Sequence, residues 1–268
     1  MSSRQLNGPQ KVARRRPRGD ACACPAERRR GAWLRAASSA LGAALLASGC
    51  GTGTAPTPSV AERIAALDAQ ITQLEAQAAR AEDVSAIKRL QRAYGYYLDA
   101  AQWDEMADLF ADDGSIEIGL DGVYVGKERV RAYLHTLGGG QVGLKRGELN
   151  EHLMLQPVID VAPDGRTAQG RWRTVIMAGE YHRDAVWGEG PYENDYVKEN
   201  GVWKIQALHW YQTFMVPYAG GWAKNKDVNG GIFVSRKLPP DRPPTVRYET
   251  WPGVYLPPYH YKNPVTGR

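Results

Sequence analysis

The spacing of hydrophobic residues changes once along this chain. Between roughly residue 61 and Gly140, apolar positions recur every three or four residues, the spacing of one face of an α-helix. After Gly140 they recur every second residue, as in half-buried β-strands. The pattern predicts an α+β protein in which a curved antiparallel sheet wraps around helices that precede it in the sequence.

The helical part divides into four segments. Residues 61–81 carry apolar residues in alternating steps of three and four, which predicts a short coiled-coil-like helix. This helix is expected to pack either against the domain or against copies of itself. A domain is expected over residues 82–215, and its three helices cover residues 82–101, 103–110 and 126–137. Glycines at 138–140 end the last of them.

The strands are expected at residues 114–119, 151–161, 165–181, 191–200 and 201–214. Asp164-Gly165 and Asn200-Gly201 are strong hairpin turns between neighbouring strands. Residues 216–268 are rich in proline and aromatic residues and have little periodicity. Because this segment is too aromatic for a disordered tail, we expect an irregular arm packed over the domain or a neighbouring subunit.

The N-terminal 50 residues have the composition of an export signal. A basic region is followed by a short apolar run that ends at Cys50, too short to span a bilayer. The ending "LASGC" resembles the bacterial lipoprotein motif, which implies lipidation of Cys50; cleavage of an ordinary signal nearby is the alternative. Residues 51–60 are a linker by composition. The protein is therefore expected to be exported and lipid-anchored to the bacterial cell envelope.

Removing this segment changes the charge. The whole chain is +5, but residues 51–268 carry a net charge of −3, so charge offers no reason to expect nucleic-acid binding. Cys22, Cys24 and Cys50 all lie in the first 50 residues, so the mature domain depends on its core rather than on disulfides.

Asp99 breaks a local rule, because a carboxylate at the C-terminal end of a helix faces the negative end of the helix dipole. One explanation is structural. The sequence "DAAQ" has the spacing of a capping box, in which Asp99 caps the following helix and Gln102 reaches back. The other explanation is functional, with the carboxylate directed into a pocket.

Three blocks of sequence carry a resemblance to a known family: "RLQRAYGYYLDAAQWDEMADLFADDGSIEI", "GVYVGKERVRAYL" and "YVKENGVWKIQALHWY". Their order and lengths resemble the SnoaL-like group of the nuclear transport factor 2-like superfamily. This resemblance implies a cone-shaped curved sheet around three helices, with an apolar pocket at its open end. Within the superfamily the chain looks most like scytalone dehydratase and hexachlorocyclohexane dehydrochlorinase.

In both enzymes an Asp at the end of the first helix orients a His that acts as the base, and Asp99 and His152 match these positions. A carboxylate bonded to one imidazole nitrogen fixes the tautomer and stabilises the protonated ring. Other positions depart from both families: Tyr94 stands where the dehydrochlorinase has a Lys, and Met177 near where the dehydratase has a second His. The substrate of neither enzyme therefore carries over.

The residues themselves leave alternatives open. His152 is either a pocket residue or a partly exposed strand residue. His209 shares one face of its strand with Trp203 and Tyr211 if the alternation is strict, and it either lines the same cavity or bonds backbone beneath the arm. Tyr94, Tyr97 and Tyr211 could donate hydrogen bonds to a developing oxyanion. The aromatic residues that could surround a ligand are Tyr94, Tyr97, Trp187, Tyr192, Tyr196 and Trp210.

Two functions compete at this point. The first is a cofactor-free lyase or isomerase acting on a small apolar or carbonyl compound, with His152 as base and Asp99 as its partner. The second is a non-catalytic lipoprotein that binds a ligand or a partner protein. No histidine spacing matches a metal-site motif and no glycine-rich phosphate loop is present, so neither a metal nor a cofactor is expected. A homodimer or homotrimer is expected in either case.

Overall fold

The computed structural model describes residues 58–233 and 238–268. The predicted signal, Cys50 and most of the predicted linker lie outside these residues. Among the described residues, no helix combines the length and apolar character needed to cross a bilayer.

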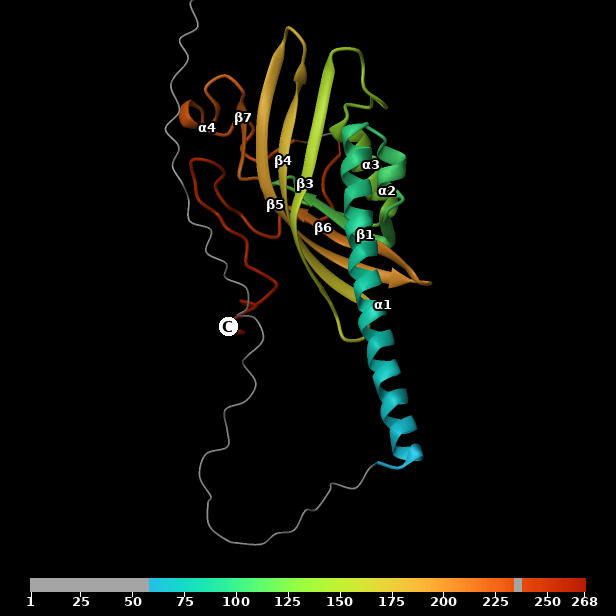
Figure 1. The fold of residues 1–268 in the computed structure, drawn as a ribbon. Coiled ribbons are helices and arrows are strands. Elements are labelled where there is room, and N and C mark those ends of the chain that lie inside the picture. The colour runs from blue at the N-terminus through green and yellow to red at the C-terminus, as the bar shows by residue number, and fades with distance from the viewer. Residues whose placement is uncertain (1–57, 234–237) are drawn as a thin grey trace, which may run out of the picture. The chain divides into compact units, whose positions relative to one another are not determined.

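The described chain forms a curved, open sheet with helices on one side (Figure 1). The strands lie in the order β2 (Val123–Val125), β1 (Phe110–Ile118), β6 (Val202–Trp210), β5 (Asp184–Glu199), β4 (Thr167–Glu180) and β3 (Glu148–Val161), and β7 (Phe214–Pro217) pairs with β5. All pairs are antiparallel except β1 with β6, which run parallel. The predicted α+β class is confirmed, with this one parallel pair as a difference.

Helix α1 (Val60–Asp99) is the longest element. A capping box starts it: the Ser59 hydroxyl accepts from the Glu62 backbone N–H, and the Glu62 carboxylate accepts from the Ser59 N–H. The segments predicted as a coiled-coil-like helix and a first domain helix are therefore one helix. Only the second half of this helix contains buried residues. Asp83 fixes that half to the start of β6, because its carboxylate accepts a hydrogen bond from the Trp203 indole N–H at 2.8 Å.

The other two helices of this layer are shorter. Helix α2 (Trp103–Ala107) ends earlier than predicted, because Phe110 already belongs to β1. Helix α3 (Lys127–Leu137) ends at Gly138, as the glycines predict. A Cβ on Gly138 would lie 2.5 Å from the Trp103 indole, so glycine is required here for the close packing of the two segments.

β-Bulges in β3 and β6 interrupt the alternation of inward and outward side chains. In β3 the pairing shifts between Leu155 and Val158, so His152 and Met154 point inward before the bulge and Ile159 and Val161 after it. In β6, Asp195 pairs with Ala207 but Tyr196 pairs with Ile205, which leaves Gln206 as the extra residue.

Strand β5 begins seven residues before the strand predicted at residue 191. Its first half contains Gly188 and Gly190, which hide the expected pattern. A Cβ on Gly190 would lie 2.2 Å from the Tyr211 carbonyl oxygen, so the close approach of the neighbouring backbone explains the glycine.

Much of the C-terminal arm predicted from residue 216 lies on the side of the sheet away from α1 (Figure 1), and the arm also reaches α3, where Asp241 and the Pro239 carbonyl accept from Arg129. It begins within β7 and contains the short helix α4 (Gly221–Lys224). Asp227 holds it in place by accepting hydrogen bonds from the Met215 backbone N–H, the Gln212 amide and the Thr250 hydroxyl. The arm is thus part of the fold.

Candidate active site

Asp99 and His152 are in contact. The last residue of α1 is Asp99, and its Oδ1 atom accepts the His152 backbone N–H at 2.7 Å and lies 3.2 Å from the His152 Nδ1 atom. A carboxylate can only accept, so this contact is a hydrogen bond when Nδ1 carries the proton. The Nε2 atom is then the basic nitrogen. Both side chains are largely buried, with 19% of the Asp99 side chain and 11% of the His152 side chain exposed.

The capping explanation of Asp99 is wrong. The N-cap residue of α2 is Gln102, and no side chain caps that helix. The carboxylate of Asp99 turns instead toward β3, where the backbone N–H and the imidazole of His152 compensate its unfavourable place at a helix C-terminus.

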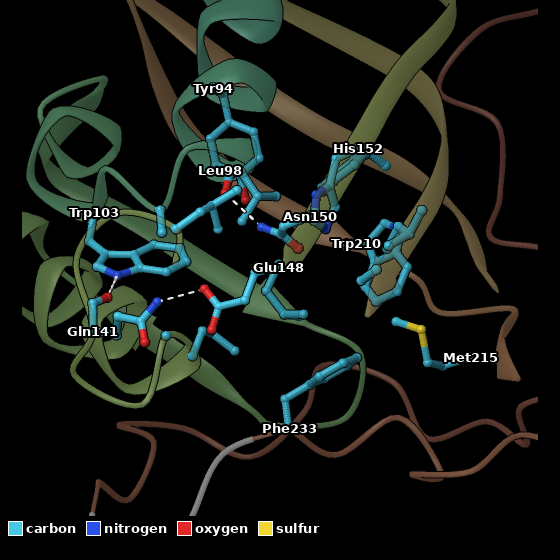
Figure 2. Close-up of a pocket in the computed structure, with 18 residues that line it drawn as sticks. Tyr94, Leu98, Trp103, Gln141, Glu148, Asn150, His152, Trp210, Met215 and Phe233 are labelled. Atoms are coloured by element: carbon cyan, nitrogen blue, oxygen red, sulfur yellow. Dashed lines mark hydrogen bonds between the residues drawn. The ribbon is translucent and has the colours of Figure 1, made fainter. Parts of the chain in front are cut away.

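His152 lines a cavity of about 350 Å³ between the helices and the sheet (Figure 2). Its size suits a small ring-containing molecule. Most of its wall is apolar or aromatic: Tyr94, Leu98, Trp103, Ile118, Ile176, Tyr192, Trp210, Met215 and Phe233.

One strand supplies a polar row on this wall. Glu148, Asn150 and His152 alternate along β3 and face the cavity together. The Asn150 amide donates to the Leu98 carbonyl at 2.8 Å. The Glu148 carboxylate accepts from the Lys145 backbone N–H at 2.7 Å and from the Gln141 amide at 2.8 Å, and these bonds lower the pKa of Glu148. The cavity therefore holds one carboxylate that is ionised at neutral pH.

Tyr94 and Tyr192, which line the largely aromatic part of the wall, each carry a hydroxyl group. Burial raises the pKa of Tyr94 well above its ordinary value and also raises the pKa of Tyr192. Both hydroxyls therefore keep their protons, and the Tyr94 hydroxyl donates to that of Tyr192. Their rings meet edge to face with centroids 6.2 Å apart.

Three of the predicted ligand-binding aromatics do not line this cavity. Tyr196 is fully buried in the core, and its hydroxyl donates to Gln91 and accepts from the Trp172 indole N–H. Trp187 packs against Tyr218 of the arm, with ring centroids 5.9 Å apart. Tyr97 lies at the edge of the core.

His209 and Tyr211 lie on the opposite face of the sheet. The bulge at Gln206 reverses the alternation of β6, so Trp203 and Ile205 face the core while His209 does not. Of the two alternatives for His209, the shared cavity is excluded for this reason, and the ring lies beneath the arm instead.

His209 and Tyr211 line a second cavity of about 680 Å³ beneath the arm. Burial lowers the pKa of His209 to about 3, so its ring is neutral at neutral pH. Its Nε2 atom lies 3.5 Å from Glu117, whose carboxylate accepts from the backbone N–H and the hydroxyl of Thr245. Burial raises the pKa of Glu117.

The described residues contain no group of three or more His, Cys, Asp and Glu side chains that could hold a metal ion. The side chains of the first cavity supply an imidazole base with its carboxylate partner, the ionised Glu148 and neutral hydrogen-bond donors.

Glu148, Asn150, Gln141, Trp103 and Phe233 were not among the predicted site residues. For two of them the sequence held a usable signal, because "ELNEH" places Glu148 and Asn150 at steps of two before His152. Gln141 and Phe233 lie in irregular segments, where periodicity carries no information about direction.

Residues 79–209 match the family model of the SnoaL-like domain. No curated protein sequence matches the chain. Solved structures with a similar fold include the hexachlorocyclohexane dehydrochlorinase LinA-type3 of Novosphingobium barchaimii, which is 18% identical with a TM-score of 0.47. That alignment covers 54% of this chain and 95% of the dehydrochlorinase.

A scytalone dehydratase-like protein of Novosphingobium aromaticivorans is 22% identical with a TM-score of 0.46, over 53% of this chain and 91% of its own. A protein of unknown function from Mycobacterium tuberculosis is 20% identical with a TM-score of 0.43, over 50% of this chain and 74% of its own. By the match of the family model, residues 79–209 of this chain are a SnoaL-like domain with the nuclear transport factor 2-like fold.

Proposed function

We propose that the first cavity is the active site of a cofactor-free lyase or isomerase that removes a proton from carbon in a small, largely apolar compound. The observation that carries this proposal is the 3.2 Å contact between Asp99 Oδ1 and His152 Nδ1 at the wall of the cavity. The contact leaves Nε2 as the base, in a cavity whose wall is mostly apolar.

In the proposed reaction, Nε2 of His152 takes a proton from a carbon next to a carbonyl group or next to a carbon that bears a leaving group. In the first case the electron pair moves to the carbonyl oxygen, and the imidazolium returns the proton to another carbon. In the second case the pair forms a C=C bond as the leaving group departs with its electrons. Asp99 stabilises the imidazolium in both cases.

The tyrosines and Glu148 restrict the charge and the chemical class of the substrates that the cavity can bind. The hydroxyls of Tyr94 and Tyr192 keep their protons, and Tyr192, which accepts from Tyr94, is the donor for developing negative charge on oxygen. The ionised Glu148 disfavours anionic ligands. We therefore propose a neutral ring-containing carbonyl or halogenated compound as the substrate class.

Hydrogen–deuterium exchange tests the proton transfer whatever the leaving group is. A panel of cyclic ketones, hydroxyketones and halogenated rings is incubated with the protein in D₂O. Deuterium incorporation or product is then followed by NMR and mass spectrometry. We expect catalysed exchange or elimination for at least one class, and its loss by about 100-fold or more in His152→Ala.

His209→Gln is the matched control, because it alters a buried histidine of the second cavity and leaves the first intact. If compounds bind in the first cavity but neither exchange nor react, the proposal fails. The non-catalytic ligand-binding alternative then holds.

A further inference from the structure

The first five turns of α1 extend beyond the rest of the fold (Figure 1). Every residue from Val60 to Glu82 is exposed, and the first buried residue of the helix is Asp83. Arg80 makes the first described side-chain bond to the sheet, to the Val161 carbonyl. The helix up to that point has no described contact with the domain's core.

This extension carries a stripe of large apolar side chains. Their exposed fractions lie between 52% and 73%: Val60, Ile64, Leu67, Ile71 and Leu74. Their spacing of four, three, four and three residues continues with Ala78 and Ala81, so the stripe is a heptad seam. Isolated exposed apolar residues need no explanation, but a continuous seam of five does.

The seam does not face the domain. On an ideal helix of 3.6 residues per turn, the direction of the seam from Ile64 to Ala81 lies about 170° from that of Ile87, Tyr94 and Leu98, which pack on the sheet. Bending α1 toward the sheet would therefore leave the seam on the outside. The described part of the domain therefore does not cover it.

We infer that the seam binds the seam of a second copy of this chain as a parallel two-stranded coiled coil. In heptad register Ile64 and Ile71 occupy position a, and Leu67 and Leu74 occupy position d. β-Branched residues at a with leucine at d favour two parallel strands. The seam is self-complementary, as a twofold interface requires.

The flanking charges favour the same pairing. Arg63 is at position g and Asp68 at the next position e, so in a parallel dimer each Arg63 meets Asp68 of the second copy. Gln70 and Glu75 have the same relation one heptad later. An antiparallel pair would bring e positions together, and Asp68 and Glu75 would then repel.

A seam of three heptads is short for an isolated peptide. In this chain, however, the second half of α1 is packed in the domain and the N-terminus is capped, so the helix is already formed before association. The association is therefore expected to be reversible in the micromolar range.

Sedimentation equilibrium of the full chain over a micromolar concentration series tests the inference. We expect a monomer–dimer equilibrium that Leu67→Lys combined with Ile71→Lys weakens by about tenfold or more. Ala69→Lys, on the opposite face of the same exposed turns, is the matched control and should leave the equilibrium unchanged. Because all these sites are exposed, unchanged near-UV circular dichroism and melting temperature show that the domain remains folded.

Charge exchange identifies the parallel register. Arg63→Asp or Asp68→Arg alone should weaken the dimer, and the double exchange should restore it. In a chain with Cys22, Cys24 and Cys50 replaced by Ser, Leu74→Cys should form an intermolecular disulfide, because a d residue faces itself only in a parallel pair. A protein that stays monomeric, or a dimer unaffected by the seam variants, would overturn the inference.

Discussion

At the scale of single residues, Asp99 has two tasks that one substitution can separate. Its Oδ1 atom accepts the His152 backbone N–H and also contacts the imidazole. Asp99→Asn can keep the backbone bond while removing the charge that stabilises the imidazolium. We expect kcat for exchange or elimination to fall by roughly 100-fold with little change in KM or melting temperature.

Steady-state kinetics and thermal unfolding of Asp99→Asn check this prediction. Asp99→Ala is the companion variant, because it removes the backbone bond as well and should also lower the melting temperature. Equal activity of Asp99→Asn and the parent protein would show that the carboxylate acts only as a structural acceptor.

His209 predicts a pH dependence of stability. Burial lowers its pKa to about 3 in the native state, against about 6.5 when unfolded. Below pH 6.5 the unfolded chain therefore binds a proton that the native chain does not, and stability falls as the pH falls toward 3. The loss attributable to His209 is about 1 kcal/mol at pH 5.5.

Urea unfolding of the parent protein and His209→Gln between pH 7.5 and 5 measures this effect, and the variant should lose less stability on acidification. Glu117 acts in the opposite direction, because its raised pKa means that the native state holds its proton more tightly. Glu117 is present in both proteins, so the difference between them isolates His209. His182→Gln, at an exposed position, should behave as the parent.

The roles of single residues were predictable where the chemistry of the side chain and its position in the predicted fold indicated the same role. Asp99 was noticeable because it opposes a helix dipole, and the family resemblance supplied His152. Tyr196 was misassigned because an aromatic side chain has the same sequence signature in a core as in a pocket. Only the buried bond to Gln91 distinguishes them.

At the scale of elements, the spacing of apolar residues predicted whether each long segment is a helix or a strand. It did not predict the direction of the side chains beyond a bulge. A bulge adds one residue and exchanges the two faces of a strand beyond it. Gln206 has no property in the sequence that marks it as an extra residue, so strict alternation puts His209 on the wrong face. Pro157 in β3 lies within the other bulge, and a proline inside a strand is a usable signal.

The junction between α2 and α3 gives an element-scale prediction. The Gly138 backbone packs against the Trp103 indole, which lines the first cavity and donates to the Gln141 carbonyl at 2.6 Å. Gly138→Ala forces the indole to move, which should cost about 1–3 kcal/mol of stability and weaken ligand binding. Tryptophan fluorescence and chemical unfolding report both effects.

The neighbouring Gly139→Ala is the control. Its φ of 61° makes a side chain unfavourable there, but a Cβ would meet no atom within 4 Å. It should lose about 1 kcal/mol through backbone strain alone and leave the Trp103 fluorescence unchanged. A Gly138→Ala protein with the parent's fluorescence and ligand affinity would contradict the predicted displacement.

At the scale of the whole described molecule, the arm completes the site that the helices and sheet begin. Met215 and Phe233 line the first cavity, and the Phe233 backbone N–H donates to Asp121 at 2.7 Å. Composition predicted that the arm packs, because aromatic residues are costly to leave exposed. Its path could not be predicted, since irregular backbone follows individual bonds rather than a period.

Removing residues 218–268 is therefore expected to affect both stability and the site. The truncation uncovers Trp210 and Tyr211 and removes the Thr245 donors from the buried Glu117 carboxylate. Exposing this apolar surface and losing the hydrogen bonds of the arm should cost several kcal/mol and lower the melting temperature by more than about 10 °C. Removing only residues 262–268, which are exposed, should change neither quantity. Differential scanning calorimetry measures the melting temperature, and ligand titration measures the affinity of the first cavity. A truncated chain that melts and binds ligand as the parent does would show that the arm contributes to neither the fold nor the cavity.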